Sequence, residues 1–499
     1  MTGLCEKGAK LLWEQCNEEL YSQGLTYLQE AAYAGDPEAW FFLGRCYSWG
    51  DGTVGFNEKK AYDCYRKGAE GGSARAVLGA VRAGQYDGEM KKAAVLTLEE
   101  SYQAVRDAAE AGDAFAAWQL AEALEGETLF SVLPEEERGK SRCLVWYEKA
   151  AEAGIVPAMV KMGKCFLNGQ YTDKDLSRYI EWADRAAACG NVWGLYRMGL
   201  YHEERENDDA AFQYFQAAFR QGDAKAPLRL GRMYLSGQGT ARDVAKAVEC
   251  FKESASRGEM ESYTELGNIF YRDEIVERDD EKAFYWYSKA YAAGHEEAAL
   301  PLARLYLRHS EIQDYQKAEK LLKEAAEADT DGQACLALGN FSRDGLGGAP
   351  DMDSAVSWYE KGAEMGNPEC MELLGCLYFQ GEEGIETDYE KAFFWLNRCY
   401  EMGTLQSYSK LAYLYLKGEG CEADEEKARD FFERAAQTEY DGYAFYELGF
   451  LCERKNESPE DLERAAEYYQ KAIEMGNESA VRRFSHFNKG LFGKWKVTY

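Results

Sequence analysis

A short sequence pattern returns about every 36 residues along most of the chain. Its centre is a leucine or methionine followed by glycine or alanine, and four consecutive steps between Leu230 and Leu374 are each 36 residues long. Self-similarity at a fixed period of this length indicates a repeat architecture in which each copy is one small structural unit. The twelve copies of the pair begin at Leu43, Leu78, Leu120, Met162, Met198, Leu230, Leu266, Leu302, Leu338, Leu374, Leu411 and Leu448.

Each copy carries two amphipathic helical patterns separated by a turn. In the copy at 226–258, the residues from Ala247 to Ala255 place small and apolar side chains at i, i+3, i+4 and i+8, on one helical face. The small residue after the leucine allows the two helices to approach closely, and aromatic residues on the second helix fill the space between neighbouring copies. Because a single hairpin cannot bury such a face, the sequence predicts an all-α solenoid of stacked hairpins. Pro301 lies inside a first helix and predicts a local kink there.

Net charge and hydropathy exclude several classes of partner. The net charge of −30 disfavours nucleic acid and membrane surfaces, because an acidic surface repels phosphate and anionic lipid. No stretch approaches about 18 uninterrupted apolar residues, so no membrane span is predicted. The first residues lack the apolar region of a secretory signal, and the 14 cysteines include no C-x-x-C pair. We therefore expect a cytoplasmic protein with reduced, mostly buried thiols.

The full repeat motif resembles a known family. It reads Ala-x-x-x-Leu-Gly-x-x-Tyr-x-x-Gly-x-Gly, followed by Asp-x-x-Lys-Ala-x-x-Trp-Tyr-x-Lys-Ala, and is similar to the Sel1-like repeat (SLR) family, relatives of the tetratricopeptide repeats. The best copies are residues 226–239, 282–290 and 391–395, and the resemblance covers roughly residues 20–477. The copy after Leu78 departs from the motif, since it has Arg82 where other copies have an aromatic residue.

The resemblance implies a right-handed superhelix of about 12 to 13 antiparallel helix-turn-helix repeats, used as a protein-interaction scaffold or adaptor. It divides the chain into a degenerate N-terminal repeat or cap at 1–36, a solenoid at 37–477, and a C-terminal cap helix with a basic aromatic tail at 478–499. Some secreted members of the family join each hairpin by a cysteine pair eight residues apart. No two cysteines here have that spacing, which favours the cytoplasmic interpretation.

Three short motifs look like parts of catalytic or nucleotide sites, and each has a plainer explanation. The sequence 139–141 resembles the end of a phosphate-binding loop, but Pro134 stands where its first glycine is required. The G-x-G-x-x-G pattern at 50–55 follows a predicted helix rather than a strand and fits the turn of the repeat. His202 begins a pattern like that of zinc proteases, but Glu206 replaces the second histidine. We therefore expect a non-enzyme with no catalytic residue, cofactor or metal.

The tetratricopeptide resemblance also implies where a ligand would bind. First helices would line a concave groove, with the residue two before the leucine and the residue after the glycine pointing into it. Arginine and asparagine can grip carboxylates and peptide backbone, so a strip of them is a candidate site for an extended peptide. The strip, spaced by 36 residues, and its flanking aromatic anchors are Arg232, Asn268, Arg304 and Asn340, with Trp118, Trp193, Tyr196, Tyr413 and Tyr446. A solvated groove without a ligand is the alternative.

The C-terminal tail is the second candidate site. Residues 479–499 contain five lysines or arginines and no carboxylate side chain, and aromatic residues alternate with the basic ones. One interpretation is a segment that caps the last hairpin. The other is docking to an acidic partner or to a second copy of the chain, through Arg482, Arg483 and Trp495.

The leading functional hypothesis is a bacterial-type adaptor that binds a protein or extended peptide in its concave groove. Two alternatives remain. One is an effector that acts on host proteins after export without a cleaved signal, and the other is a regulatory subunit of an enzyme encoded nearby. The repeat pattern reports packing, so it does not identify the partner.

Overall fold

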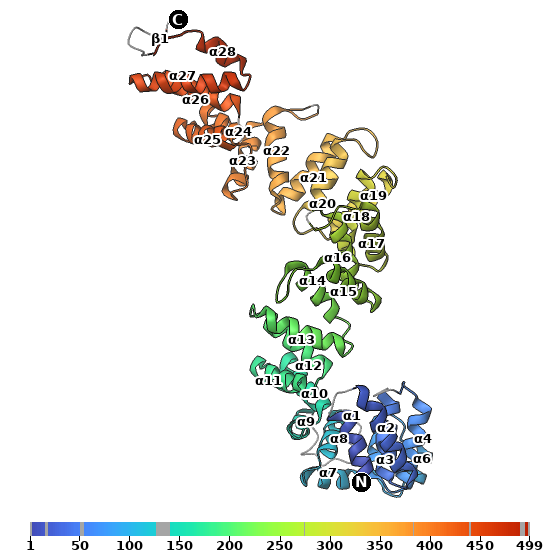
Figure 1. Ribbon diagram of the computed structural model, residues 1–499. Helices are drawn as coiled ribbons and strands as arrows, with labels where there is room; N and C mark the ends of the chain where they lie inside the picture. The colour runs from blue at the N-terminus through green and yellow to red at the C-terminus, as the bar shows by residue number, and fades with distance from the viewer. Residues whose placement is uncertain are drawn as a thin grey trace. The chain divides into compact units, whose positions relative to one another are not determined.

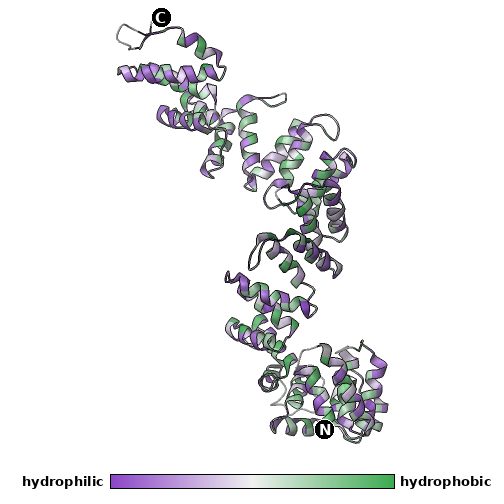
Figure 2. Ribbon diagram, in the orientation of Figure 1, coloured by the Kyte–Doolittle hydropathy of each residue, from purple (hydrophilic) through white to green (hydrophobic). Residues whose placement is uncertain are grey.

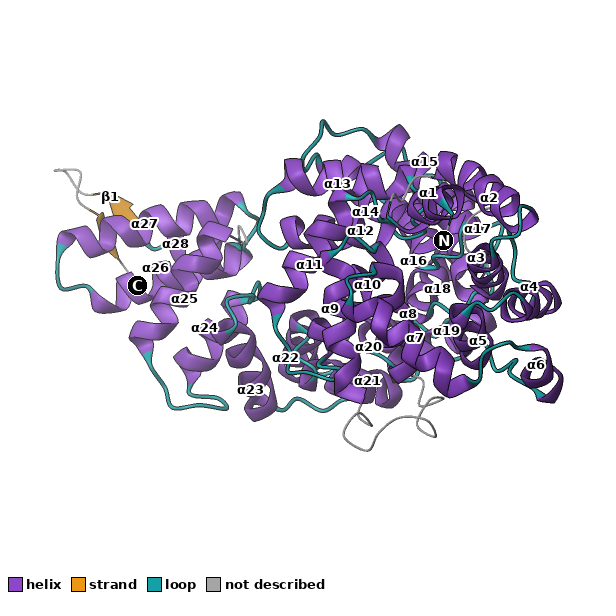
Figure 3. Ribbon diagram, turned by 90° about the horizontal axis from the view of Figure 1, so that it is seen from below, coloured by secondary structure: helices purple, strands orange, loops and turns teal. Residues whose placement is uncertain are grey.

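The structure, a computed structural model, describes residues 2–14, 18–49, 54–125, 140–273, 275–382, 384–438, 441–489 and 495–497. The regular secondary structure of the described residues is helical, apart from one small hairpin after the last helix and an isolated bridge (Figures 1 and 3). The chain divides into two compact units, Met1–Leu266 and Gly267–Tyr499. In each unit, helices that follow one another in sequence pack as antiparallel pairs. The predicted all-α solenoid of helical hairpins is confirmed.

The first unit begins with a leading hairpin and continues with successive first and second helices of the repeats. Its elements are α1 (Gly3–Trp13), α2 (Glu18–Tyr33), α3 (Pro37–Trp49), α4 (Glu58–Glu70), α5 (Ala74–Arg82), α6 (Gly88–Ala93), α7 (Leu98–Glu110), α8 (Ala114–Glu125), the 3₁₀ turn η2 (Lys140–Arg142), α9 (Cys143–Glu152), α10 (Val156–Asn168), α11 (Leu176–Ala188), α12 (Val192–Glu203), α13 (Asp208–Arg220), α14 (Ala226–Ser236) and α15 (Val244–Ser256). The division between the units falls within α16 (Glu261–Tyr271).

The second unit continues the same alternation and ends in a two-stranded antiparallel sheet. Its elements are α17 (Asp280–Ala292), η3 (Glu296–Ala298), α18 (Ala299–Arg308), α19 (Tyr315–Glu327), α20 (Gln333–Arg343), α21 (Met352–Glu364), α22 (Pro368–Gln380), α23 (Tyr389–Glu401), α24 (Tyr408–Lys417), α25 (Glu425–Thr438), α26 (Gly442–Lys455), α27 (Pro459–Glu474), α28 (Glu478–Phe484), β1 (Phe487–Lys489) and β2 (Trp495–Val497). In the sheet, Phe487 pairs with Val497.

The small residue after the leucine or methionine, which is glycine in most copies, sets how closely the helices pack. A Cβ atom on Gly231 would lie 2.6 Å from the ring of Phe251, which is fully buried in the second helix of the same hairpin. A Cβ atom on Gly339 would overlap the ring of Tyr359 in the same way. Each helix therefore has a small-residue and apolar stripe toward its partner and polar residues elsewhere, which Figure 2 shows as mixed colouring along the ribbons.

Aspartate or asparagine begins most second helices. The Asp243 carboxylate accepts a hydrogen bond from the backbone N–H of Lys246 at 3.0 Å, which satisfies one of the N–H groups left unpaired at a helix start. The hairpin ends at a glycine in the left-handed region, such as Gly258 with φ 93°. Equivalent side-chain caps are Asn57, Asp175, Asn207, Asp279, Asp314, Asp351 and Asp388.

Pro301, where the sequence predicts a kink, lies just after a change from a 3₁₀ turn to an α-helix. The 3₁₀ turn η3 precedes α18, which begins at Ala299, so Pro301 lies in the first turn of the helix. A first turn contains backbone N–H groups that have no acceptor within the helix. The missing N–H of proline therefore costs little there, and a tight 3₁₀ turn comes directly before the helix.

Candidate partner-binding face

The candidate site is the first-helix face, which we define as the residues two before the leucine and one after the glycine in each first helix. The structure places the four residues of the predicted strip on this face, with Arg232 in the first unit and Asn268, Arg304 and Asn340 in the second. All four are partly exposed. Each of them also makes a contact within the protein, and these contacts are of two kinds.

The arginines reach forward to the next first helix. Arg232 on α14 pairs with Glu265 at 2.7 Å and with Glu261 at 3.0 Å, both on α16. Burial alone would lower the pKa of Arg232, but its hydrogen bond to Glu265 and the nearby charges of both carboxylates raise it above the ordinary value. Arg304 on α18 donates to Gln333 on α20 at 2.9 Å, with the same sequence separation as the pair of Arg232 and Glu261. Arg232 is thus neutralised by two carboxylates, whereas Arg304 faces a neutral amide.

The asparagines accept hydrogen bonds from tyrosines of their own hairpins. The hydroxyl of Tyr287 donates to Asn268 Oδ1 at 2.7 Å, and that of Tyr359 donates to Asn340 Oδ1 at 2.7 Å. Both tyrosine side chains are fully buried, and a buried hydroxyl without a partner would be costly. Burial raises the pKa of Tyr359 to about 12. The amide oxygens of these asparagines therefore have a structural role. Their amide nitrogens have no hydrogen-bond partner among the described residues and remain available as donors.

The identity of the aromatic residue explains which face residue stands opposite it. Where the second helix supplies Phe215 or Phe251, no hydroxyl needs an acceptor, and the residue after the glycine is Leu200 or Arg232. In other hairpins the acceptor comes from one turn further along, as with Glu453, which accepts a hydrogen bond from the hydroxyl of Tyr469 at 2.7 Å. The sequence analysis missed this relation, although the co-occurrence of tyrosine and asparagine nineteen positions apart was visible in the sequence.

In the first repeats the face carries a buried cluster of charged and aromatic side chains. Arg45 on α3 forms two hydrogen bonds with Glu122 on α8, at 2.7 and 3.0 Å, and Arg82 on α5 pairs with the same carboxylate. Arg45 lies 3.6 Å over the ring of Trp118, which is only 4% exposed and also contacts Trp13 of α1. The leading hairpin and α3 cover most of the Trp118 ring, and its role as a ligand anchor stays a prediction.

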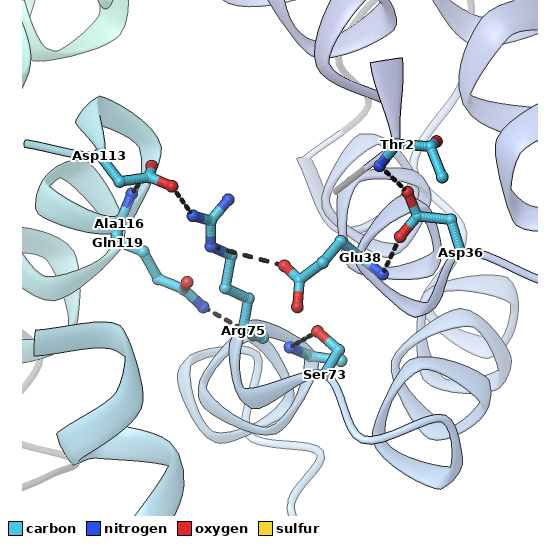
Figure 4. A network of polar contacts seen from close by, with 9 residues as sticks. Thr2, Asp36, Glu38, Ser73, Arg75, Asp113, Ala116 and Gln119 are labelled. Atoms are coloured by element: carbon cyan, nitrogen blue, oxygen red, sulfur yellow. Dashed lines mark hydrogen bonds and ion pairs between the residues drawn. The ribbon is translucent and has the colours of Figure 1, made fainter. Parts of the chain in front are cut away.

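A second buried network joins the same three first helices near their N-terminal ends (Figure 4). The guanidinium of Arg75 on α5 contacts Asp113, which precedes α8, and lies 3.5 Å from Glu38 on α3. Gln119 on α8 donates to the backbone carbonyl of Arg75 at 2.6 Å. Together with the contacts of Glu122, this network fixes α3, α5 and α8 against one another.

The four remaining aromatic anchors are half-buried, and each packs on a neighbouring ring. Trp193 lies against Tyr179 at 6.1 Å, and its ring also covers Gly163 on the preceding first helix. Tyr196 packs on Phe215 at 5.7 Å. Tyr413 packs on Phe379 at 5.3 Å, and Tyr446 packs on Tyr469 at 5.9 Å. Each ring therefore contributes to the core and exposes part of its surface.

The tail residues contact the last hairpin. Arg483 on α28 holds Glu453 on α26 with two hydrogen bonds, at 2.9 and 3.2 Å, and Glu453 is nearly buried. Trp495 on β2 packs on Phe484 at 5.6 Å and on Phe487 at 6.2 Å. These contacts favour the capping interpretation for Arg483 and Trp495. The short sheet itself was not anticipated from the sequence, and docking through the exposed Arg482 stays a prediction.

The described residues contain no cluster of side chains suited to hold a metal ion. His202 stacks on Tyr214 at 5.3 Å, and no group of three or more His, Cys, Asp or Glu side chains in the described ranges is placed to hold a metal ion. Thirteen of the cysteines are described, all of them free and most of them buried. Residues 50–53 and 139, which belong to the two glycine-containing motifs, lie outside the described residues. No described helix is both long enough and apolar enough to cross a membrane.

Comparison with known proteins identifies the repeat. The Sel1 repeat family matches residues 37–73, 114–155, 156–191, 194–223, 224–259, 261–295, 298–329, 332–367, 368–404, 405–437 and 443–477. The copy at Leu78 is not among the matched residues, and there α5 is short and the extra helix α6 separates it from α7.

One solved structure resembles the whole chain. It is the crystal structure of a protective antigen present in uropathogenic Escherichia coli strains, described as displaying an SLR fold. It shares 25% sequence identity with a TM-score of 0.66, covering 92% of this chain and 97% of that chain.

Two curated proteins are similar over part of their length. An uncharacterised protein of Neisseria meningitidis serogroup B is 26% identical over 280 residues, which are 55% of this chain and 56% of that protein. Chitin synthase regulatory factor 3 of Schizosaccharomyces pombe is 27% identical over 107 residues, which are 19% of this chain and 12% of that protein. The chain thus spans less than two thirds of the length of either relative. From the eleven matched segments and the hairpin packing described above, the chain belongs to the Sel1 repeat family.

Proposed function

We propose that the protein is a non-enzymatic scaffold that binds a protein or peptide partner along its first-helix face. Sel1 repeat proteins generally mediate protein–protein interactions, and their fold is typically a non-catalytic scaffold. The observation that supports this face is the state of Arg304 in the second unit. Arg304 is partly exposed, and among the described residues its side chain has the neutral Gln333 as hydrogen-bond partner and no ion pair, so its positive charge is available to a partner.

The surroundings of Arg304 suit a peptide. Asn340 stands at the same position of the next first helix, with its amide oxygen held by Tyr359 and its amide nitrogen left as a donor. A side chain that is fixed before binding loses less conformational entropy on binding, which favours recognition of an extended segment. Tyr413 and Tyr446 expose part of their rings on the same face of later hairpins in this unit. Such rings are frequent anchors in protein interfaces.

The experiment compares two charge reversals of equal size. A partner is first identified by affinity purification with the wild-type chain, and its binding is then measured for Arg304→Glu and for Lys320→Glu. Lys320 is 73% exposed on the second helix α19, away from the first-helix face. The proposal predicts that Arg304→Glu abolishes binding at unchanged helicity, while Lys320→Glu binds normally. Equal binding by both variants, or equal loss, would contradict it.

A further inference from the structure

The first unit contains a cavity of about 460 Å³ where the C-terminal ends of α3, α5 and α8 meet α10. Cavities of this size are typical of sites that take a small group or a few side chains. Its wall includes Trp13, Trp49, Trp118 and Tyr147, with charged side chains between the rings. We call this cavity the N-terminal pocket, and nothing in the functions discussed so far uses it.

The charges that line the pocket are unbalanced. Four of its side chains are cationic and two are anionic, in a chain whose net charge is −30. Glu122 is shared by two guanidinium groups, since it accepts two hydrogen bonds from Arg45 and also contacts Arg82. One carboxylate therefore faces two positive charges on this side of the pocket.

The second carboxylate is fully engaged as well. Glu125 accepts hydrogen bonds from Lys161, from Tyr147 at 2.8 Å and from Tyr171 at 3.2 Å. Burial acts to raise the pKa of Glu125, but these hydrogen bonds and the charge of Lys161 hold it below the ordinary value. The carboxylate stays ionised and balances Lys161 alone. Neither acidic residue of the pocket is left to neutralise a further cation.

Two cations consequently keep capacity for a ligand. Among the described residues, Arg82 has one ionic partner, the shared Glu122, and its guanidinium lies 4.6 Å over Trp49. Lys164 is exposed on α10, lines the pocket and has no ion pair within the described part of the chain. A carboxylate placed between Arg82 and Lys164 would gain charge-assisted hydrogen bonds. Trp49, which is 55% exposed, offers an apolar surface beside it.

We infer that the N-terminal pocket binds an acidic side chain of a partner's peptide segment, with a flanking aromatic or apolar residue packed on Trp49. This inference rests on the proposed function, because it makes the pocket an anchoring subsite for a protein partner. A polyanion such as nucleic acid does not fit, since the acidic body around the pocket repels a continuous phosphate chain. A short peptide presents one or two carboxylates and avoids that repulsion.

The test begins with a random peptide library displayed on phage and selected on the full-length wild-type chain. The expected outcome is enrichment of peptides in which Asp or Glu stands next to an aromatic or large apolar residue. An enriched peptide is then labelled with fluorescein, and its affinity is measured by fluorescence anisotropy for the wild-type chain and for variants. A copy of the peptide with Gln in place of Glu, or Asn in place of Asp, is the ligand control.

Lys164→Glu and Arg82→Gln should each lower the affinity for the labelled peptide by about tenfold or more, as expected for loss of a charge-assisted hydrogen bond. The matched control is Lys174→Glu, an exposed lysine between α10 and α11 that does not line the pocket, and its affinity should stay within about twofold of wild type. Failure to enrich any peptide, enrichment without acidic residues, or equal affinity for Lys164→Glu would overturn the inference. The proposed function would then still be decided separately, by Arg304→Glu in the second unit.

Discussion

The hydrogen bond between Tyr359 and Asn340 allows a quantitative test of the packing scheme. Tyr359 is fully buried, and its hydroxyl donates to the amide oxygen of Asn340 at 2.7 Å. Asn340→Ala removes the acceptor and leaves a buried donor, which costs about 1–3 kcal/mol. Tyr359→Phe removes the donor as well, so Asn340→Ala in that background should cost no more than about 0.5 kcal/mol. The expected coupling between the two positions is thus about 1–2 kcal/mol.

Hydrogen exchange is the suitable assay, because each hairpin of a solenoid contacts mainly its neighbours and opens locally. Peptides from α20 and α21 would be followed by mass spectrometry in the wild-type chain, both single variants and the double variant. A local loss of about 1.4 kcal/mol corresponds to a tenfold loss of protection. Cys376→Ala is the matched control, since Cys376 stands after the glycine of the next hairpin, where Leu396 replaces the aromatic ring. If Asn340→Ala has the same effect with and without Tyr359→Phe, the reasoning is refuted.

Three further predictions concern other contacts. Glu122→Gln should destabilise the first unit by about 3–5 kcal/mol, because it leaves two guanidinium groups beside a neutral amide; thermal unfolding checks this, and an unchanged transition contradicts it. Arg483→Ala should lower the stability of the last hairpin by leaving the buried carboxylate of Glu453 without its cation, whereas Arg482→Ala should not, as limited proteolysis of the C-terminal region can show. Burial raises the pKa of Tyr65 and of Tyr359 to about 12, so both remain neutral in the folded chain after unfolded tyrosines ionise near pH 10. Stability should therefore be fully present below pH 10 and fall between about pH 10 and 12, and a denaturation midpoint that does not change over this pH range would contradict this.

The sequence predicted the parts of the fold that depend on contacts within one hairpin. The glycine after the leucine and the aromatic residue of the second helix, as in Gly231 and Phe251, repeat at a fixed distance and so are visible as a pattern. The burial of Trp118 could not be predicted in this way. It requires α1 and α3, which lie far from α8 in the sequence, to pack over the Trp118 ring.

The sequence indicated where the residues of the candidate site lie on their helices, but not which side chains they pair with. The spacing of 36 residues correctly placed Arg232 and Arg304 at equivalent points of their first helices, but it did not indicate that Glu261 and Glu265 would neutralise the first of them. Those carboxylates belong to the following copy, and their alignment with Arg232 depends on how the hairpins stack. The partner of a surface charge is thus a property of the assembled array and cannot be seen in one repeat.

The exchange of tyrosine for phenylalanine in the second helix has a consequence for how the surface of such an array can diversify. Where a hydroxyl is present, as in Tyr359, substitution of Asn340 carries a stability cost, and drift at that point is restricted. Where Phe251 takes the same place, no buried hydroxyl needs an acceptor, and the residue at position 232 can change with little effect on its own hairpin. Replacement of a buried tyrosine by phenylalanine therefore allows the residue after the repeat glycine to change, so that the exposed face can acquire a new binding specificity.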